Sequence, residues 1–290
     1  MLLTLKNYLS FIKFSHTIFA LPFALIGFVL SIKDDLTKFN PVLLIYVVLC
    51  MVFARSAAMG FNRFIDRKFD ALNPRTKMRE VPAGVISTSA ALIFVVLMSV
   101  LFIATTWFIN PICFYLSPVA LLVVLGYSYT KRFTALCHIV LGVGLALAPI
   151  GAYLAVTGKF AWLPLLFSFT VLFWVSGFDI IYALQDEEFD RSQNLKSIPG
   201  YLGKKNALHL SELLHVLSAL LVIFAGYYAA FGYLYWIGVL VFCGLLVYQH
   251  SIVKPTDLSR VNLAFGTTNG IASVIFACFT IAEMLLNFKK

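Results

Sequence analysis

Residues 41–70 read PVLLIYVVLCMVFARSAAMGFNRFIDRKFD, an apolar run that passes directly into a charged segment. A helix needs about 20 mostly apolar residues to cross the hydrocarbon core of a bilayer, and the apolar run has that length. The charged segment follows the pattern N-x-x-x-D-x-x-x-D. At 100° per residue, Asn62, Asp66 and Asp70 lie within about 80° of each other on a helix. The stretch therefore predicts a membrane helix with an amide and two carboxylates on one stripe at its end, and Arg55 points the same way from inside the span.

The composition of the whole chain agrees with a membrane protein. Of the 290 residues 61% are hydrophobic and 12% are charged, whereas soluble domains have about 45–50% and about 25%. Apolar surface in that excess needs lipid as its solvent. We predict an all-α bundle in which residues 1–290 form a single domain of about nine transmembrane helices. The expected spans are 14–32, 42–61, 86–108, 111–129, 134–156, 161–183, 207–230, 233–250 and 263–286.

The basic residues predict the orientation of these helices. Sixteen of the 22 lysines and arginines fall in the N-terminal segment or in the connections after the second, fourth, sixth and eighth spans. Five fall on the opposite side, including Lys289 and Lys290. Short cytoplasmic loops carry an excess of Lys and Arg, so we expect the N-terminus and these four connections in the cytoplasm of a cell with an inner membrane. The net charge of +9 then reflects topology, and no nucleic-acid partner is expected.

The two long connections, residues 62–85 and 184–206, resemble each other. Asp186 and Asp190 in the second follow Asp66 and Asp70 in the first at the same offset of 120 residues. This pattern predicts a weak internal repeat of two four-helix halves with a ninth helix added. Repeats of this kind often place a functional site at their interface.

The second acidic motif begins inside the sixth predicted span. On a continuous helix Asp179, Asp186 and Asp190 lie within about 40° of each other, and Tyr182 lies on the shoulder of that strip. Several carboxylates in or near lipid repel one another and are costly unless they are paired or bind a metal. Carboxylate and amide oxygens suit Mg²⁺, which usually keeps waters and bridges to substrate phosphates.

Basic and phenolic side chains accompany the two acidic motifs. Tyr127 and Lys131 are four residues apart at the end of the fourth span, so a phenol and a cation face the same way. Arg132, with Arg75 and Arg79 in the first long connection, supplies further cations for phosphate oxygens. The sequence therefore predicts a Mg²⁺–diphosphate site at which diphosphate becomes a leaving group.

Each of these features also has a simpler interpretation. The acids near helix ends can be boundary residues that pair with Arg63, Arg67 and Arg191, and Arg55 can be a structural partner of Asp66. The histidines lack the spacing of a metal site and receive no role: His16, His138, His209, His215 and His250. A secondary transporter also has many helices, a repeat and membrane acids, but it places its ionisable residues near the bilayer midplane. A non-catalytic membrane scaffold has no reason to duplicate acidic strips.

The motifs resemble those of the UbiA superfamily of intramembrane prenyltransferases. The resemblance is carried by residues 62–70, 73–76, 79–84, 127–132 and 179–199. Residues 15–22 and 182–186 look most like the 4-hydroxybenzoate polyprenyltransferase branch, and also like a relative used in menaquinone synthesis by the futalosine route.

The resemblance implies a nine-helix bundle with an opening to lipid, in which residues 62–85 and 184–206 form a cytosolic cap over the site. It implies Mg²⁺–diphosphate ligands at Asn62, Asp66, Asp70, Asp186 and Asp190. It also implies a diphosphate contact from Lys131 and an acid before the second motif at Asp179.

From the residues and the resemblance together we expect transfer of a polyprenyl group from polyprenyl diphosphate to an aromatic acid, 4-hydroxybenzoate, in quinone biosynthesis. Arg55 is expected to bind the acceptor carboxylate. Dihydroxynaphthoate, a haem and a glyceryl phosphate lipid are the alternative acceptors. The sequence predicts neither the prenyl chain length nor the oligomeric state.

Overall fold

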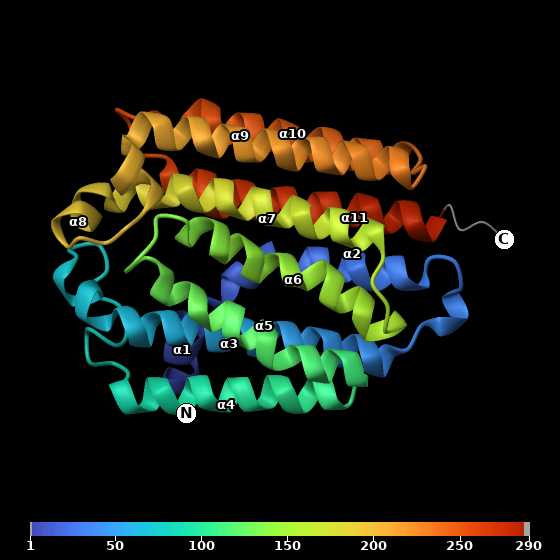
Figure 1. Cartoon of the computed structure of the whole chain (residues 1–290), viewed down its shortest axis with the longest axis horizontal. Helices are drawn as coiled ribbons and strands as arrows, with labels where there is room; N and C mark the ends of the chain where they lie inside the picture. Colours follow the sequence, from blue (N-terminus) through green and yellow to red (C-terminus); the bar gives the residue numbers. More distant parts are fainter. Residues whose placement is uncertain (1, 287–290) are drawn as a thin grey trace.

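The computed structural model describes residues 2–286, with side chains described for residues 6–13 and 17–286, and Lys289 and Lys290 lie outside this range. Every regular element within the described residues is helical, and the long helices run side by side in one bundle (Figure 1). The all-α prediction is confirmed.

Eight helical segments of the described chain are long and apolar enough to cross a membrane, and a shorter apolar helix, Thr17–Ile32, makes a ninth. The long ones are α3 (Pro41–Leu72), α4 (Thr88–Trp107), α5 (Pro111–Thr130), α6 (Cys137–Thr157), α7 (Trp162–Ala183), α9 (Ile198–Tyr228), α10 (Tyr233–Ile252) and the π-helical turn η4 (Leu263–Thr268) with α11 (Asn269–Leu286).

The first predicted span differs from the others because it is short and enclosed. Residues 14–32 form a 3₁₀ segment, η1 (Phe14–Phe19), and the 12-residue helix α2 (Leu21–Ile32). At 1.5 Å per residue α2 is about 18 Å long, less than the roughly 30 Å of a hydrocarbon core. Most of its side chains are buried, as expected for a helix that is apolar on all sides. A Cβ on Gly27 would lie 2.1 Å from the carbonyl oxygen of Pro149, so α2 packs directly against the backbone of α6.

Local sequence explains where several helices begin. The Asn40 side chain accepts hydrogen bonds from the backbone N–H groups of Val42 and Leu43, and Pro41 occupies the first turn of α3. Asn110 caps α5 in the same way, again with a proline directly after it. These side chains satisfy N–H groups that a helix leaves unpaired, and proline needs no such partner.

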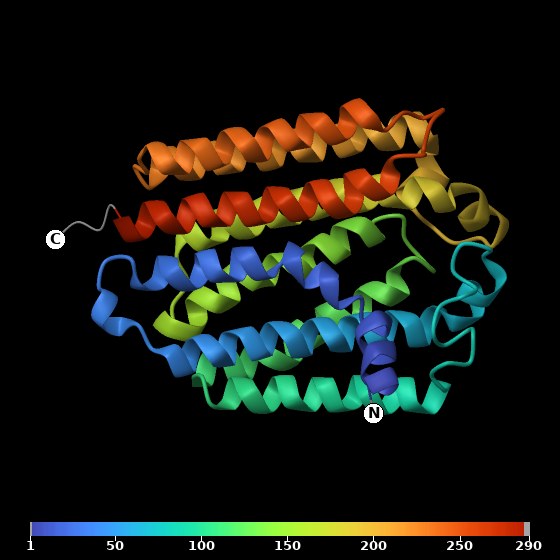
Figure 2. The same ribbon diagram turned by 180° about the vertical axis from the view of Figure 1, so that it is seen from behind.

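The N-terminal helix α1 (Leu2–Phe11) was not predicted. It crosses the long helices instead of running along them (Figure 2). Tyr8 stacks near Phe94 of α4 with ring centroids 5.2 Å apart, and Ser10 donates a hydrogen bond to Glu80 at 2.6 Å. At 10 residues α1 is too short to be recognised as a membrane span.

The surface and the centre of the bundle differ as lipid exposure requires. Trp174, Val175 and Phe178 of α7 are buried, whereas large apolar side chains of other helices point outward, such as Leu122, which is 74% exposed. Contiguous exposed apolar surface of this kind suits a lipid environment. The packing of α3 against α4 is matched by that of α7 against α9, as expected for two related halves.

The connections segregate by charge. The basic connections after α3, α5 and α10, together with the short helix α8 (Glu187–Ser192) after α7, lie at one end of the bundle (Figure 1). Helix α11 ends at the opposite end. This arrangement brings all of the polar motifs to one end.

Candidate active site

A polar cavity of about 570 Å³ lies at this end of the bundle. It is lined from α3, the connection after it, the junction of α5 and α6, α7 and α8. All but one of the predicted site residues line it: Arg55, Asn62, Asp66, Asp70, Arg75, Arg79, Tyr127, Lys131, Asp179, Tyr182, Asp186 and Asp190. The remaining one, Arg132, contacts Asp66 through an ion pair of 2.8 Å.

The first acidic motif forms the stripe that the sequence predicts, because α3 continues unbroken to Leu72. Asn62 donates a hydrogen bond to Asp66 at 3.0 Å. Asp70 forms an ion pair with Arg79 at 2.7 Å. The second oxygen of Asp70 is buried and accepts no hydrogen bond from the described part of the chain, so it is available to a further ligand.

The second acidic motif departs from the expected continuous helix. Helix α7 ends at Ala183, and the 3₁₀ turn η3 (Leu184–Asp186) separates it from α8. A 3₁₀ turn has about 3.0 residues per turn instead of 3.6, so the angle of about 40° expected between Asp179 and the two later acids does not apply. Asp186 is buried and accepts a hydrogen bond of 3.0 Å from the Asn73 side chain. Asp190 lines the polar cavity from α8.

The second motif is held by cations from the first half of the chain. Arg75 contacts both carboxylate oxygens of Asp186, and its Nε lies 2.9 Å from Oδ1. Its Nη1 donates a hydrogen bond to the Tyr182 hydroxyl at 2.9 Å. A bidentate pair of this kind fixes both the position and the plane of the carboxylate. Lys131 forms an ion pair with Asp190 at 2.7 Å.

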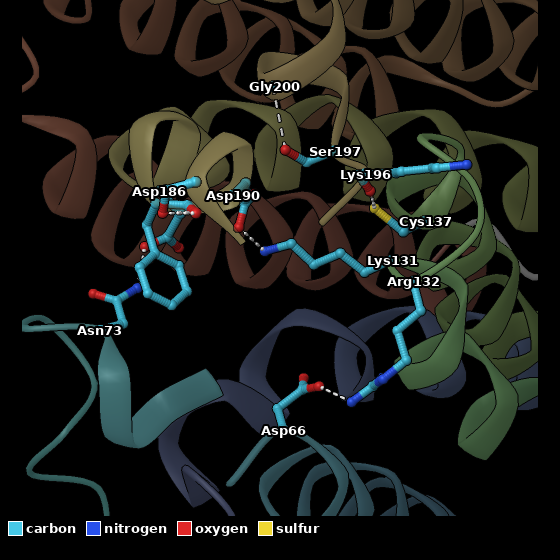
Figure 3. A network of polar contacts seen from close by, with 12 residues as sticks. Asp66, Asn73, Lys131, Arg132, Cys137, Asp186, Asp190, Lys196, Ser197 and Gly200 are labelled. Carbon is cyan, nitrogen blue, oxygen red and sulfur yellow. Dashed lines mark hydrogen bonds and ion pairs between the residues drawn. The ribbon is translucent and has the colours of Figure 1, made fainter. Parts of the chain in front are cut away.

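Lys131 and Arg132 connect the two motifs. They are adjacent in sequence at the end of α5, yet Lys131 contacts Asp190 of the second motif while Arg132 contacts Asp66 of the first (Figure 3). Burial alone would lower the pKa of Lys131, but the Asp190 carboxylate outweighs this effect and holds that pKa above its ordinary value. Lys131 therefore stays charged at neutral pH.

These pairs replace the ones that the simpler interpretation expects. Arg67 donates to the carbonyl of Phe64, and Arg191 pairs with Glu187 on its own helix. Arg55 does not pair with Asp66. Its Nε is buried and has no hydrogen-bond partner within the described residues.

An apolar cavity of about 390 Å³ adjoins the polar one, enclosed mainly by α3, α4, α5 and α6. Arg55, Met59, Tyr127, Leu141 and Leu145 line both cavities. The cationic group of Arg55 and the phenol of Tyr127 therefore stand where the charged and the apolar spaces meet. The arrangement suits a molecule with an anionic head and a long apolar tail.

The donor set fits Mg²⁺ shared with a phosphate group. Within residues 2–286 no three acidic, histidine or cysteine side chains converge into a complete ligand set for one ion. Mg²⁺ rarely needs such a set, because it is usually held by one or two carboxylates, waters and phosphate oxygens. Asp66 and Asp70 on one wall and Asp186 and Asp190 on the other offer hard oxygen ligands on both sides of the cavity.

His138 received no role from the sequence, but the structure places it in the site. His138, at the start of α6, lines the polar cavity, and its Nδ1 lies 2.7 Å from Oδ2 of Asp179. The two residues are 41 positions apart on different helices, and no spacing in the sequence indicates the contact.

Comparison with known proteins identifies the family. Residues 20–278 match the family described as the UbiA prenyltransferase family. The chain is 30% identical over 228 residues to the 4-hydroxybenzoate octaprenyltransferase of Tolumonas auensis, a match that covers 79% of each chain.

Solved structures share the fold. The apo structure of a UbiA homolog from Aeropyrum pernix K1 has a TM-score of 0.80 and 28% identity, covering 94% of this chain and 98% of that one. A UbiA homolog from Archaeoglobus fulgidus bound to GPP and Mg²⁺ has a TM-score of 0.72 and 22% identity, covering 96% of this chain and 99% of the other. This chain is an integral membrane protein and belongs to the UbiA prenyltransferase family.

Proposed function

We propose that this prenyltransferase moves a polyprenyl group from polyprenyl diphosphate to a ring carbon of 4-hydroxybenzoate, in a Mg²⁺-dependent reaction of quinone biosynthesis. The observation that carries the proposal is the junction of a cavity lined by two acidic motifs with an apolar cavity, with Arg55 and Tyr127 between them. The relative from Tolumonas auensis, whose name includes this acceptor, supports the choice.

The polar cavity binds the diphosphate in this proposal. Mg²⁺ held by Asn62, Asp66, Asp70, Asp186 and Asp190 would neutralise the charge that develops on the departing diphosphate. Lys131, Arg132, Arg75 and Arg79 are close enough to the same cavity to contact the remaining phosphate oxygens.

The apolar cavity holds the prenyl chain. Apart from Arg55 and Tyr127 at its junction with the polar cavity, its wall is made mainly of apolar side chains such as Val47, Leu116 and Leu147, which suit contacts with a prenyl chain. An enclosed apolar site also protects the positive charge on the allylic carbon from water as the C–O bond breaks. The product leaves into the bilayer, where its tail is soluble.

The acceptor lies at the junction of the two cavities. The Nε of Arg55 has no hydrogen-bond partner among the described residues, and its guanidinium is suited to a carboxylate, which accepts two parallel hydrogen bonds from such a group. Tyr127 lines the same place and can contact the aromatic ring. The excess of Lys and Arg in the connections at this end then places the cavity on the cytoplasmic side.

The test is a transfer assay in nanodiscs with labelled polyprenyl diphosphate, a panel of acceptors that includes 4-hydroxybenzoate and dihydroxynaphthoate, and either Mg²⁺ or EDTA. We expect Mg²⁺-dependent product from 4-hydroxybenzoate, and its loss in Asp66→Asn and Asp186→Asn. Glu188→Gln is the matched control, because this carboxylate lies two residues from Asp186 but its side chain is 92% exposed and does not line the cavity.

The acceptor and the metal site are tested separately by this assay. Product from dihydroxynaphthoate alone would replace the acceptor and leave the metal site intact. Asp66→Asn and Asp186→Asn proteins that behave like Glu188→Gln would refute the assignment of the metal ligands.

A further inference from the structure

Asp179 differs from the other acids of the cavity in the partner it contacts. Each of the four acids in the two motifs forms an ion pair with a lysine or an arginine. Asp179 forms none with either residue type in the described part of the chain, and its Oδ2 lies 2.7 Å from Nδ1 of His138.

The contacts around His138 indicate which ring nitrogen donates to Asp179. The backbone N–H of Ile198 points at Nε2 of the imidazole at 3.4 Å, and an amide N–H can only donate. Nε2 is therefore the acceptor, and Nδ1 carries the hydrogen that is donated to Asp179. His138 is 3% exposed, so little of it faces the cavity, and its contact with Asp179 is how it acts on the site in this proposal.

The close contact of α6 and α7 holds the pair together. A Cβ on Gly142, one turn after His138, would lie 2.5 Å from the carbonyl oxygen of Leu172 and 2.4 Å from Oγ of Ser176. Ser176 also donates to the carbonyl of His138 at 3.2 Å. The two helix backbones are thus fixed at the level where His138 must reach Asp179.

Asp179 lines the part of the site where the acceptor is expected to bind. Its side chain is 22% exposed and lines the polar cavity together with Arg55 and Tyr127. Asp179 lies on α7, seven residues before Asp186, whereas the second motif lies on η3 and α8.

We propose that Asp179, positioned by His138, takes the proton that the acceptor ring loses; this role rests on the proposed aromatic prenyl transfer. The ring carbon forms a bond to the first carbon of the prenyl chain, and the C–O bond breaks with its electron pair remaining on the diphosphate. The ring carbon then loses its hydrogen as a proton to a carboxylate oxygen of Asp179, and the C–H electron pair restores the aromatic ring. Asp179 is the catalytic residue in this step and His138 is a positioning residue.

The experiment compares Asp179→Asn, His138→Leu and His138→Asn in nanodiscs with 4-hydroxybenzoate and its ring-deuterated form. Asp179→Asn keeps the shape of the side chain and removes the proton acceptor, so kcat should fall about a hundredfold. Because proton loss then becomes slow, the deuterated acceptor should react more slowly than the ordinary one, an isotope effect larger than that of the wild type. Binding of polyprenyl diphosphate with Mg²⁺ should be unchanged.

The histidine variants separate positioning from folding. His138→Leu removes the donor and should lower kcat about tenfold or more, since misplaced catalytic groups lose rate steeply. His138→Asn keeps an N–H near the position of Nδ1 and should recover most of this loss, which a purely structural effect would not require.

The outcomes distinguish this role from the reaction itself. An active wild type with unchanged kcat in Asp179→Asn would overturn the role of Asp179 and leave the prenyl transfer in place, as would a lower kcat without any increase in the isotope effect. A wild type that prenylates no aromatic acid would refute the proposed function and this role with it.

Discussion

The ion pair between Lys131 and Asp190 makes a prediction about stability that is independent of activity. Its N–O distance is 2.7 Å, and the Asp190 side chain is 0% exposed while that of Lys131 is 30% exposed. Removing one partner of a buried pair leaves an uncompensated charge and typically costs about 3–5 kcal/mol. Because Lys131 is partly in contact with solvent, we expect Lys131→Met to cost about 2–3 kcal/mol, slightly less than for a fully buried pair.

A double-mutant cycle measures this interaction. Lys131→Met, Asp190→Asn and the double variant are unfolded in the same mixed micelles, and the free energy of unfolding is followed by tryptophan fluorescence. Asp190→Asn removes the buried charge, so the double variant should be more stable than Lys131→Met alone, although it should not regain prenyl transfer. Lys77→Met is the control, because Lys77 is exposed in the connection after α3 and forms no ion pair within the described residues. Its effect should stay within about 0.5 kcal/mol.

The result that would refute this reasoning is additivity. If the two single changes sum to the double change, the pair contributes no interaction energy, and the contact across the two motifs is not formed in the folded protein. A Lys131→Met protein as stable as Lys77→Met would contradict the prediction equally.

Three further changes test other parts of the site. Arg55→Met should raise KM for 4-hydroxybenzoate by about tenfold or more, because one charge-assisted hydrogen bond is worth about 1.5–3 kcal/mol, and should leave the KM for the prenyl diphosphate unchanged; equal effects on both would contradict a role in acceptor binding. Gly142→Ala should destabilise the protein by about 1–3 kcal/mol in thermal unfolding, because the added Cβ meets the backbone of α7. Gly244→Ala is the control and should leave the stability unchanged, because the space around its new Cβ is open. Ala120→Phe should shorten the longest prenyl diphosphate that is used, by filling part of the apolar cavity, and an unchanged chain-length profile by mass spectrometry of the products would place the prenyl chain elsewhere.

Much of the fold could be predicted because lipid imposes a length and a composition on each span. The expected span 263–286 agrees with η4 and α11 at both ends, and 161–183 differs from α7 by one residue. Asn40-Pro41 and Asn110-Pro111 act as helix starts, as their chemistry predicts. The exceptions are α1 and α2, which are too short for that rule, and α9, which begins at Ile198, nine residues before the expected span 207–230.

The sequence predicts those parts of the site that depend on the geometry of a single helix. The stripe of Asn62, Asp66 and Asp70 follows from helix periodicity, and α3 keeps that periodicity through the motif. The predicted strip of Asp179, Asp186 and Asp190 is wrong because η3 interrupts the helix. No residue in Leu184–Asp186 marks a change to a 3₁₀ turn, so the sequence did not indicate it. The contact of His138 with Asp179 depends on how closely two helices pack, which the sequence indicates only indirectly through Gly142.

Each of the four aspartates of the two motifs has a basic partner from a neighbouring connection. Four carboxylates in one cavity beside hydrocarbon would repel each other, and each is offset here by its own cation. All four cations extend from the connections after α3 and α5 and none from within a membrane helix. Lysine and arginine side chains are long and flexible, so they can exchange a carboxylate oxygen for a phosphate oxygen while the helices stay in place.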